Sequence, residues 1–421
     1  MARSFILKLS NPLHHPPCRV WQASLLLLGA TSACGQAATS PAGTSARPFT
    51  VHEVAKFCSP WALAFLPGTS GNALVTEKAG KIWLVDVASG AKTEVAGVPT
   101  IKAGGQGGLL GVFAAPSFAS DHGVYLTYSE PSPAGGSGLA LARATFAPGA
   151  SPRLDGAKVI WRDPAGGSGG QFGAIVAFAP DGKSLFLSSG ERQRFTPAQD
   201  PNQPIGKILH LTLDGKAMAG NPAAGKVGAR NLTITAPPQD TVAARTALGR
   251  TFAWPGANDT PAQTWSSGHR NPYGLAFDAA GRLWETEMGP KGGDELNLIL
   301  PGRNYGWPEV SQGQNYNGVP IAAHSTRPDY EAPKLSWVPS ISPSSLLIYS
   351  GNRFPGWRGS GLIGALSAQA LIRVSLDPGG AKKLDQWDMG ARIRFVGQGP
   401  DGAVYLLEDE GPLVRLDPIR R

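Results

Sequence analysis

A pair of β-strands recurs six times along the chain, and this repetition limits the fold more than any other feature. Each copy has a short apolar run, a turn rich in Pro, Asp or Gly, and a second run of β-forming residues. The copies begin at Pro60, Leu109, Gly173, Pro272, Pro343 and Ile393. Repeats of roughly 40–50 residues are typical of propeller blades. The sequence therefore predicts an all-β fold, a six-bladed β-propeller over residues 49–421.

Two connections between the repeats are longer than a turn requires. One runs from Leu213 to Trp265 and is rich in Pro, Ala, Gly and Asn, and the other runs from Gly306 to Ser336 and is rich in Asn, Gly and Tyr. Long loops on a rigid scaffold are commonly functional. We expect both loops to wall a pocket over the central channel.

Residues 1–34 have the composition of an export signal. Basic residues precede the apolar run Ala23–Gly29, which is too short to span a bilayer. Residues 35–48 are rich in Ala, Thr, Ser, Pro and Gly and are predicted to be a flexible linker. The small residues before Cys34 resemble a lipoprotein signal, which would add a lipid anchor at Cys34, and ordinary cleavage near Ala37–Ala38 is the alternative. Either processing predicts a periplasmic or secreted protein.

Charge and cysteine content argue against several classes of protein. The net charge of +8 is scattered without a basic run, which is atypical of nucleic-acid binding but would suit an anionic cofactor. Of the three cysteines, only Cys58 lies within the predicted propeller. The sequence therefore predicts no internal disulfide and a buried, small apolar role for Cys58. No Cys/His pattern has the spacing of a zinc site.

The densest group of candidate functional residues lies within Trp265–Trp307. Arg270–Asn271 precede one strand-like run, and a second such run ends at Gly289–Pro290, shortly before Asp294. Polar groups are thus placed at the ends of short strands, where binding and catalytic groups are most often found. His269 is predicted to be a packed, hydrogen-bonded structural residue.

Six motifs in order resemble those of the glucose/sorbosone dehydrogenase family. They are GQGGLLGVFAAPSF at Gly105, AQDPNQPIGKIL at Ala198, GHRNPYGLAFD at Gly268, EMGPKGGDELNLI at Glu287, NYGWP at Asn304 and RIRFVGQGPDG at Arg392. The resemblance covers residues 50–418. It implies an exported six-bladed quinoprotein that uses pyrroloquinoline quinone (PQQ) and Ca²⁺ to oxidise an aldose sugar. It leaves the sugar, the electron acceptor and the oligomeric state open.

The resemblance also implies roles for four residues that would bind the cofactor. Arg270 and Asn271 match the pair that contacts the quinone, and Arg392 and Arg394 match two further cofactor-binding arginines. The chemistry is suitable because PQQ carries carboxylates and Arg presents forked donors to such groups. The alternatives are a blade-end salt bridge for Arg270 and a solvated strand face for the other two arginines.

Four further assignments concern metal and substrate. Gly289 and Pro290 match the residues whose backbone carbonyls hold calcium, an ion that prefers oxygen ligands. Asp294 is placed to support that loop or to cap a turn. Gln106 matches a substrate-contacting glutamine, with a loop-stabilising amide as the alternative.

The chain departs from the family pattern at the catalytic base. Gln171, in QFGAIVAFAPDG, occupies the position of the family's catalytic histidine, and Ser367 replaces a cofactor-contacting lysine. A glutamine amide does not accept a proton at neutral pH. The base therefore remains open between Asp163, Glu191 and a water held by Gln171.

Three functions are compatible with these residues. The first is oxidation of an aldose at C1 to the lactone with hydride transfer to PQQ, in which Gln171 and Arg270 take the catalytic positions. The second, favoured by Gln171 and Ser367, is a catalytically weak or inactive propeller that binds a quinone, a sugar or a polysaccharide. The third, a calcium-dependent lactonase, ranks last because the sequence shows no clustered carboxylates.

Overall fold

The computed structural model describes residues 45–419 apart from 70, 133–135, 168–169 and 236–248. The expected signal segment, Cys34 and most of the expected linker lie outside these residues. At the end of the linker, the main-chain N–H of Ser45 and Nε of Arg47 donate to the carbonyls of Gln386 and Asp388. Within the described ranges, no helix has both the length and the apolar character needed to cross a membrane.

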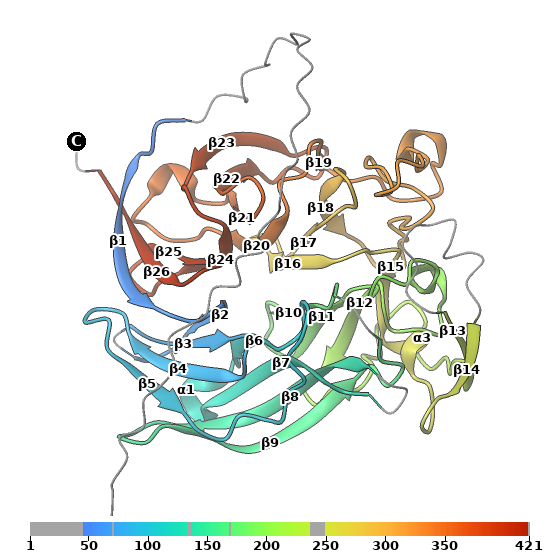
Figure 1. Cartoon of the computed structure of the whole chain (residues 1–421), viewed down its shortest axis with the longest axis horizontal. Helices are drawn as coiled ribbons and strands as arrows, with labels where there is room; N and C mark the ends of the chain where they lie inside the picture. Colours follow the sequence, from blue (N-terminus) through green and yellow to red (C-terminus); the bar gives the residue numbers. More distant parts are fainter. Residues whose placement is uncertain (1–44, 70, 133–135, 168–169, 236–248, 420–421) are drawn as a thin grey trace, which may run out of the picture. The chain divides into compact units, whose positions relative to one another are not determined.

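Six antiparallel sheets of four strands form the blades (Figure 1). The first has β2 (Pro60–Phe65), β3 (Asn72–Glu77), β4 (Lys81–Asp86) and β5 (Lys92–Val95). The second has β6 (Leu109–Ala114), β7 (Gly123–Pro131), β8 (Ser137–Ala147) and β9 (Arg153–Arg162). The third has β10 (Gly173–Phe178), β11 (Ser184–Ser189), β12 (Lys207–Thr212) and β15 (Thr264–Ser267).

The remaining three blades follow the same plan. The fourth has β16 (Pro272–Phe277), β17 (Leu283–Glu287), β18 (Asp294–Ile299) and β19 (Leu335–Trp337). The fifth has β20 (Pro343–Ile348), β21 (Gly361–Ala365), β22 (Ala370–Ser375) and β23 (Lys382–Asp388). The sixth has β24 (Ile393–Gln398), β25 (Val404–Glu408), β26 (Pro412–Pro418) and β1 (Phe49–Lys56).

Within the described residues, the short helices and one extra hairpin lie in connections between strands. The helices are α1 (Phe118–Asp121), η1 (Thr196–Gln199), α3 (Thr260–Gln263), η2 (His324–Thr326) and η3 (Pro355–Trp357). The hairpin pairs β13 (Asn231–Thr235) with β14 (Gly249–Ala253).

The first strand of each blade lines the centre of the ring. β2, β6, β10, β16, β20 and β24 each contact the next, and β24 contacts β2. These six strands begin at the residues where the six sequence repeats begin. The prediction of an all-β, six-bladed propeller is therefore confirmed.

The sixth blade joins the two ends of the folded chain. β1 pairs antiparallel with β26, with Phe49 opposite Pro418, and the ring of Phe49 packs edge-on against Trp357 and Trp387 at 5.9 and 5.4 Å. β1 was not predicted from the sequence because most of its side chains are exposed, which leaves little apolar pattern. This pairing means that the ring cannot open without breaking the β1–β26 ladder.

The core lies between neighbouring blades. Its largest apolar cluster includes the fully buried Leu74, Leu126 and Leu187 from three successive blades. Each blade buries both faces against its neighbours, so its central strands are apolar on both sides. The rigid sheets thereby hold the loops at the strand ends, where the candidate site lies.

The two long connections lie in different parts of the molecule relative to the predicted site residues. Gly306–Ser336 brings Trp307 and Tyr316 to the guanidinium of Arg270, at 5.2 and 6.0 Å from the ring centres. The described part of Leu213–Trp265 instead lines a cavity of about 220 Å³ that includes none of the predicted site residues. Among the described residues, only the loop Gly306–Ser336 is therefore observed at the site.

Cys58 differs from its prediction. It is exposed and disulfide-bonded, and it lies in the turn between β1 and β2 rather than on the inward face of a strand. The sequence analysis had assigned the other two cysteines to segments outside the folded domain and so missed this bond. The prediction of a buried, small apolar residue was wrong.

Candidate functional site

The predicted site residues gather at the ends of the blades' first strands. Gln106, Gln171, Arg270 and Arg392 stand one to three residues before β6, β10, β16 and β24, respectively. Gly289 stands two residues after β17, which is the strand paired with β16. Because the blades repeat with the same strand order around the channel, these loops meet at one mouth of it.

A chain of hydrogen bonds joins four of these residues across three blades. Gln106 Oε1 accepts from the main-chain N–H of Gln171 at 2.7 Å. Gln171 Oε1 accepts from Nη2 of Arg270 at 2.8 Å. Arg270 Nη1 in turn donates to the carbonyl of Gly289 at 2.6 Å. The structure therefore shows a loop-stabilising contact for Gln106, which was its alternative role, and contact with a substrate stays a prediction.

The amide of Gln171 is oriented by two charged neighbours. With Nε2 toward the carboxylate of Glu191 and Oε1 toward Arg270, both of its hydrogen bonds are satisfied, whereas the opposite orientation satisfies neither. Gln171 is 5 % exposed and has a φ of 58°. The main-chain carbonyl oxygen of Gln171 lies where a Cβ on Gly190 would be, so only glycine fits at position 190.

Glu191 is the carboxylate beside Gln171. It is fully buried, and its Oε2 accepts from the main-chain N–H of Phe195 at 2.5 Å. Burial raises the pKa of Glu191 to about 7, although the charge of Arg270 and nearby backbone N–H groups act in the opposite direction. The site therefore contains a carboxyl group that changes its charge near neutral pH.

Asp163, the other candidate carboxylate, has different neighbours. Its Oδ1 accepts from the main-chain N–H of Ala165 at 3.0 Å, and the nearest charges are those of Arg192 and Arg194. Burial raises the pKa of Asp163 as well. Asp163 is thus influenced by the charges of Arg192 and Arg194 from the loop after β11, whereas the carboxylate of Glu191 contacts Gln171.

Arg270 and Asn271 are held by one buried carboxylate. Glu287 Oε2 accepts from both main-chain N–H groups, at 2.5 and 3.2 Å, and Asn271 Oδ1 accepts from the N–H of Gly173 at 3.3 Å. The guanidinium also lies 3.5 Å from the hydroxyl of Tyr316, which is 65 % exposed. Nε of Arg270 is buried and has no hydrogen-bond partner among the described residues.

Sequence reasoning missed Tyr316 and Trp307 as neighbours of Arg270. Both belong to the long loop Gly306–Ser336, which is far from Arg270 in sequence and lacks strand periodicity. The only available signal was the richness of that loop in aromatic residues and Asn. Their contact with Arg270 depends on how the loop folds back over the blade.

Arg392 and Arg394 share a single carboxylate. Asp409 accepts from Nε of Arg392 at 2.8 Å and from Nη2 of Arg394 at 2.6 Å. Burial alone would raise the pKa of Asp409, but the two guanidinium groups outweigh it and lower the pKa. The guanidinium of Arg394 also lies 4.3 Å from the ring centre of Trp61. Both arginines therefore have structural partners, and one positive charge remains unbalanced.

Lys78 adds a third cation that the sequence analysis did not single out. It follows β3 by one residue, and its Nζ donates to the carbonyl of Gly105. Burial and the charge of Arg394 lower the pKa of Lys78, while Asp409 raises it. Lys78, Arg392 and Arg394 thus surround one carboxylate, and this excess of positive charge would attract an anionic ligand. By contrast, Ser367 is exposed and donates to the carbonyl of Ser340 at 3.2 Å.

Asp294 holds the glycine loop after β17. Its Oδ1 accepts from the main-chain N–H of Gly289 at 2.9 Å, and its Oδ2 accepts from Ser340 Oγ at 2.6 Å. Gly289 cannot carry a Cβ, because the carbonyls of Gly292 and Gly293 lie in that position. Pro290 follows as a buried residue. The loop therefore presents backbone oxygens from a position that Asp294 fixes.

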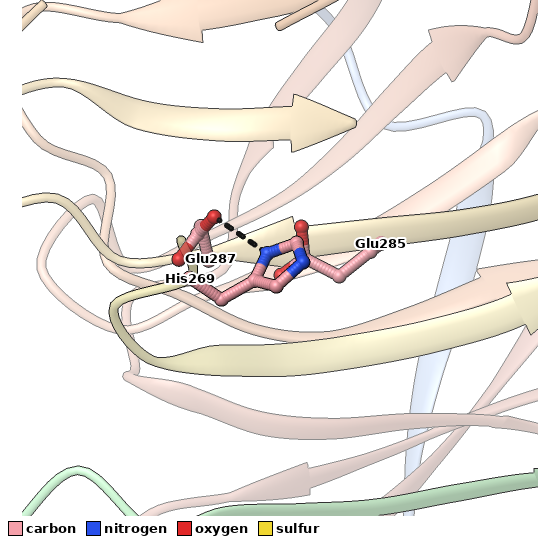
Figure 2. Close-up of side chains that lie close together, drawn as sticks. All are labelled: His269, Glu285 and Glu287. Atoms are coloured by element: carbon pink, nitrogen blue, oxygen red, sulfur yellow. Dashed lines mark hydrogen bonds and ion pairs between the residues drawn. The ribbon is translucent and has the colours of Figure 1, made fainter. Parts of the chain in front are cut away.

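A buried polar cluster lies behind this loop. His269, Glu285 and Glu287 place one ligand atom each within 4.8 Å of one another (Figure 2). Asn297 Nδ2 donates to Glu285, Glu287 and Glu295 at 3.1, 3.3 and 3.2 Å. Burial and the charge of Glu287 raise the pKa values of Glu285 and Glu295.

This cluster offers oxygen ligands to a cation. Glu285 Oε1 and Asn297 Oδ1 are buried without a hydrogen-bond partner in the part of the chain that the structure describes. The sequence analysis found no clustered carboxylates, and that expectation was wrong. Glu285 and Glu287 are two apart in β17 and therefore face the same side, and the pairing of β17 with β18 adds Glu295 to them.

His269 is packed and hydrogen-bonded, as predicted. Its Nε2 lies 2.9 Å from Ser266 Oγ and its Nδ1 lies 3.3 Å from Glu287 Oε1. The ring stacks on Tyr305 with the ring centres 4.7 Å apart. His269 thus supports Glu287, which in turn holds Arg270.

The fold and the site define a six-bladed propeller with a charged, hydrogen-bonded channel mouth. The sequence profile of the glucose/sorbosone dehydrogenase family matches residues 57–236 and 251–415. The chain therefore belongs to the glucose/sorbosone dehydrogenase family. It is 35 % identical over 373 residues to the aldose sugar dehydrogenase YliI of Escherichia coli, covering 86 % of this chain and 91 % of that protein.

Two solved structures show the same relationship in three dimensions. The soluble aldose sugar dehydrogenase of Escherichia coli, in its apo form, has a TM-score of 0.76 and 32 % identity, covering 88 % of this chain and 99 % of that one. The PQQ-bound aldose sugar dehydrogenase of Streptomyces coelicolor has a TM-score of 0.64 and 26 % identity, covering 89 % and 99 %. The resemblance inferred from the six motifs is therefore confirmed.

Proposed function

We propose that this chain is a PQQ- and calcium-dependent sugar dehydrogenase that oxidises an aldose at C1 to the lactone. The observation that carries the proposal is the position of Arg270, which Glu287 holds at the channel mouth and which contacts both Gln171 and Gly289. The related sugar dehydrogenases, one of them PQQ-bound, support the same chemistry.

The described residues fit an anionic cofactor. Lys78, Arg392 and Arg394 provide three cations for one carboxylate, Asp409. The buried Nε of Arg270 adds a donor that has no partner among the described residues. PQQ carries carboxylates, and arginine binds such groups through two parallel hydrogen bonds. We infer that these cations and Asn271 hold the cofactor.

The cofactor would supply the acceptor for the hydride that leaves C1 of the sugar. The protein's own part is electrostatic and positional. Arg270 places a fixed positive charge where negative charge develops, which is a large contribution in a water-poor site. Gln171 and Gln106 offer amide oxygens and nitrogens that orient the sugar hydroxyl groups.

Calcium is proposed at the loop after β17. The carbonyls of Gly289 and Pro290 would be its ligands, and Asp294 fixes the loop through the N–H of Gly289. The proposal is supported by buried oxygens of Glu285 and Asn297 that have no hydrogen-bond partner among the described residues, since calcium prefers oxygen ligands. Chelation is expected to weaken PQQ binding and to lower the melting temperature of the protein, and added Ca²⁺ should restore both.

A spectral titration tests the proposal directly. The purified protein is titrated with PQQ in the presence and absence of Ca²⁺, and an aldose panel is then added with an artificial dye as electron acceptor. Saturable binding followed by reduction of the quinone supports a dehydrogenase, whereas absence of binding would overturn the proposal. Binding without reduction across the panel would support the second candidate, a catalytically weak binding propeller, which the amide at Gln171 favours.

Export is proposed from the N-terminal composition. The prediction is a mature protein in the periplasm or the medium that begins either at Cys34 or near Ala37–Ala38. Mass spectrometry of the native protein distinguishes a lipid-modified Cys34 from cleavage near Ala37–Ala38. An intact N-terminus on cytoplasmic protein would overturn the proposal.

A further inference from the structure

Gln171 stands where the family resemblance predicts a catalytic histidine, so another group must accept the proton. A candidate lies directly behind Gln171. Glu191 stands two residues after β11, and its buried carboxylate contacts Nε2 of Gln171. Its other oxygen accepts from the N–H of Phe195 at 2.5 Å. The inference rests on the proposed function, because it concerns the proton of the sugar hydroxyl.

Gln171 connects this carboxylate with the charged group of the site. Its Oε1 accepts one hydrogen bond from Arg270 at 2.8 Å, and an amide oxygen has a second lone pair for a hydroxyl group. A sugar hydroxyl near Arg270 would therefore meet Oε1 of Gln171, while Nε2 on the other side meets Glu191. The amide lies between the place where a proton is released and a carboxylate that can accept it.

We propose that Glu191 is the proton acceptor of the sugar oxidation and that Gln171 relays the proton to it. The C1 hydroxyl proton bonds to Gln171 Oε1 as its O–H bond breaks, and an Nε2 proton bonds to Glu191 as its N–H bond breaks. Gln171 becomes the imidic acid and Glu191 the neutral acid. The electron pair of the broken O–H bond becomes the second C1–O bond, and the C1–H pair would leave as hydride to the quinone that the proposed function supplies. The amide returns when Glu191 gives its proton back to Nε2 and Oε1 releases its own to water.

The surroundings of Glu191 suit a group that exchanges a proton near neutral pH. Its pKa is raised to about 7 by burial, and a base is most effective when its pKa lies near the working pH. The charged groups that act on it are Arg270 from the next blade and Arg192 from its own loop. Asp163 is buried too, but the charges that act on it are those of Arg192 and Arg194.

The experiment uses the full-length protein loaded with PQQ and Ca²⁺, and compares wild type, Glu191→Gln, Gln171→His and the double variant. We expect Glu191→Gln to lower kcat by about 100-fold, within the range typical of general-base catalysis, with little change in KM. It should also remove the acid limb of the kcat–pH profile. The double variant should regain most of the lost kcat, because an imidazole at position 171 accepts the proton itself.

Two outcomes would overturn the inference. One is an acid limb that survives in Glu191→Gln, and the other is a double variant that stays as slow as Glu191→Gln, which would indicate a merely structural carboxylate. Asp163→Asn is the matched control, since it removes a neighbouring buried carboxylate and should keep the acid limb.

A second readout does not depend on turnover. Infrared difference spectra of the protein without cofactor, wild type minus Glu191→Gln, should show a protonated carboxyl group that disappears as the pH rises through neutrality. A carboxylate already ionised at pH 5 would contradict the assignment. Failure of the proposed function has a separate sign, which is the absence of saturable PQQ binding by the wild type.

Discussion

In the blades that begin with β10 and β16, the residues just before the first strand and just after the second form what we call the opening of the blade. The two openings have the same geometry but different chemistry. Gln171 and Arg270 each stand two residues before the first strand, and Glu191 and Gly289 each stand two residues after the second. The registers correspond, because Gly173 pairs with Ser189 and Pro272 pairs with Glu287. In both blades the residue before the first strand bonds to the residue after the second.

The difference lies in what each pair presents to the channel. At β16 a guanidinium bonds to a carbonyl, so the charge is permanent and the partner is backbone. At β10 an amide bonds to a buried carboxylate, so the charge depends on pH. In the proposed mechanism the β16 opening stabilises charge and the β10 opening transfers the proton, and the hydrogen bond that Arg270 donates to Gln171 links them.

The largest expected effect comes from removing the permanent charge. Arg270→Ala should lower kcat/KM by about 10²–10³-fold, the usual result of losing one preorganised donor to developing charge. Steady-state kinetics with a dye acceptor would measure it. Arg282→Ala is the control, because Arg282 pairs with Asp278 in the outer turn of the same blade and should leave the rate almost unchanged. A similar loss in both variants would show that the effect is not specific to the opening.

The second effect concerns stability and belongs to the β10 opening alone. Burial raises the pKa of Glu191 from 4.5 to about 7, so its neutral form is favoured in the folded state. The stability that this neutral carboxyl group contributes is fully present below its pKa in the unfolded state and is lost as the pH rises through its pKa in the folded state. The total change in the free energy of unfolding is about 3 kcal/mol. The free energy of unfolding of wild type relative to Glu191→Gln, from urea titrations of the cofactor-free protein, should fall by this amount between pH 4.5 and 8. A constant difference would contradict the assignment.

A third test places at position 171 the histidine that the family resemblance predicts there. Gln171→His should raise kcat at least about tenfold, because an imidazole accepts the proton directly and general-base catalysis contributes about 10²–10⁴-fold. Its kcat–pH profile should show the titration of the new histidine. An unchanged or lower kcat with normal PQQ binding would mean that proton transfer does not limit the wild type.

The smallest expected effect concerns Lys78, which follows β3 and lies close enough to Arg394 of β24 for that charge to lower its pKa. Lys78→Met should weaken PQQ binding about fivefold, close to 1 kcal/mol, since Lys78 is half-exposed and its charge is partly screened. Lys81→Met is the matched control, because Lys81 pairs with Glu94 on the surface. Equal affinities for both variants would remove Lys78 from the cofactor site.

The propeller could be predicted from the sequence because its signal is local. Each blade repeats an apolar strand, a turn and a second strand, so the starts at Pro60 or Pro272 are visible without any knowledge of long-range contacts. The departure at Gln171 is equally visible, because it is a matter of residue type at a motif position. β1 and the exposed Cys58 were missed because their packing depends on segments far away in the chain.

What only the tertiary structure decided is which groups meet. From the sequence, Asp163 and Glu191 were equivalent alternatives for the base. Both are buried, and their distances from Gln171 along the chain give no reason to prefer either. The fold places Glu191 on the amide because the end of β11 lies beside the start of β10. Likewise Lys78 approaches Arg394 across two blades, and the carboxylates of Glu285 and Glu295 meet through strand pairing. Such contacts follow from ring closure and strand register, which no local stretch of sequence encodes.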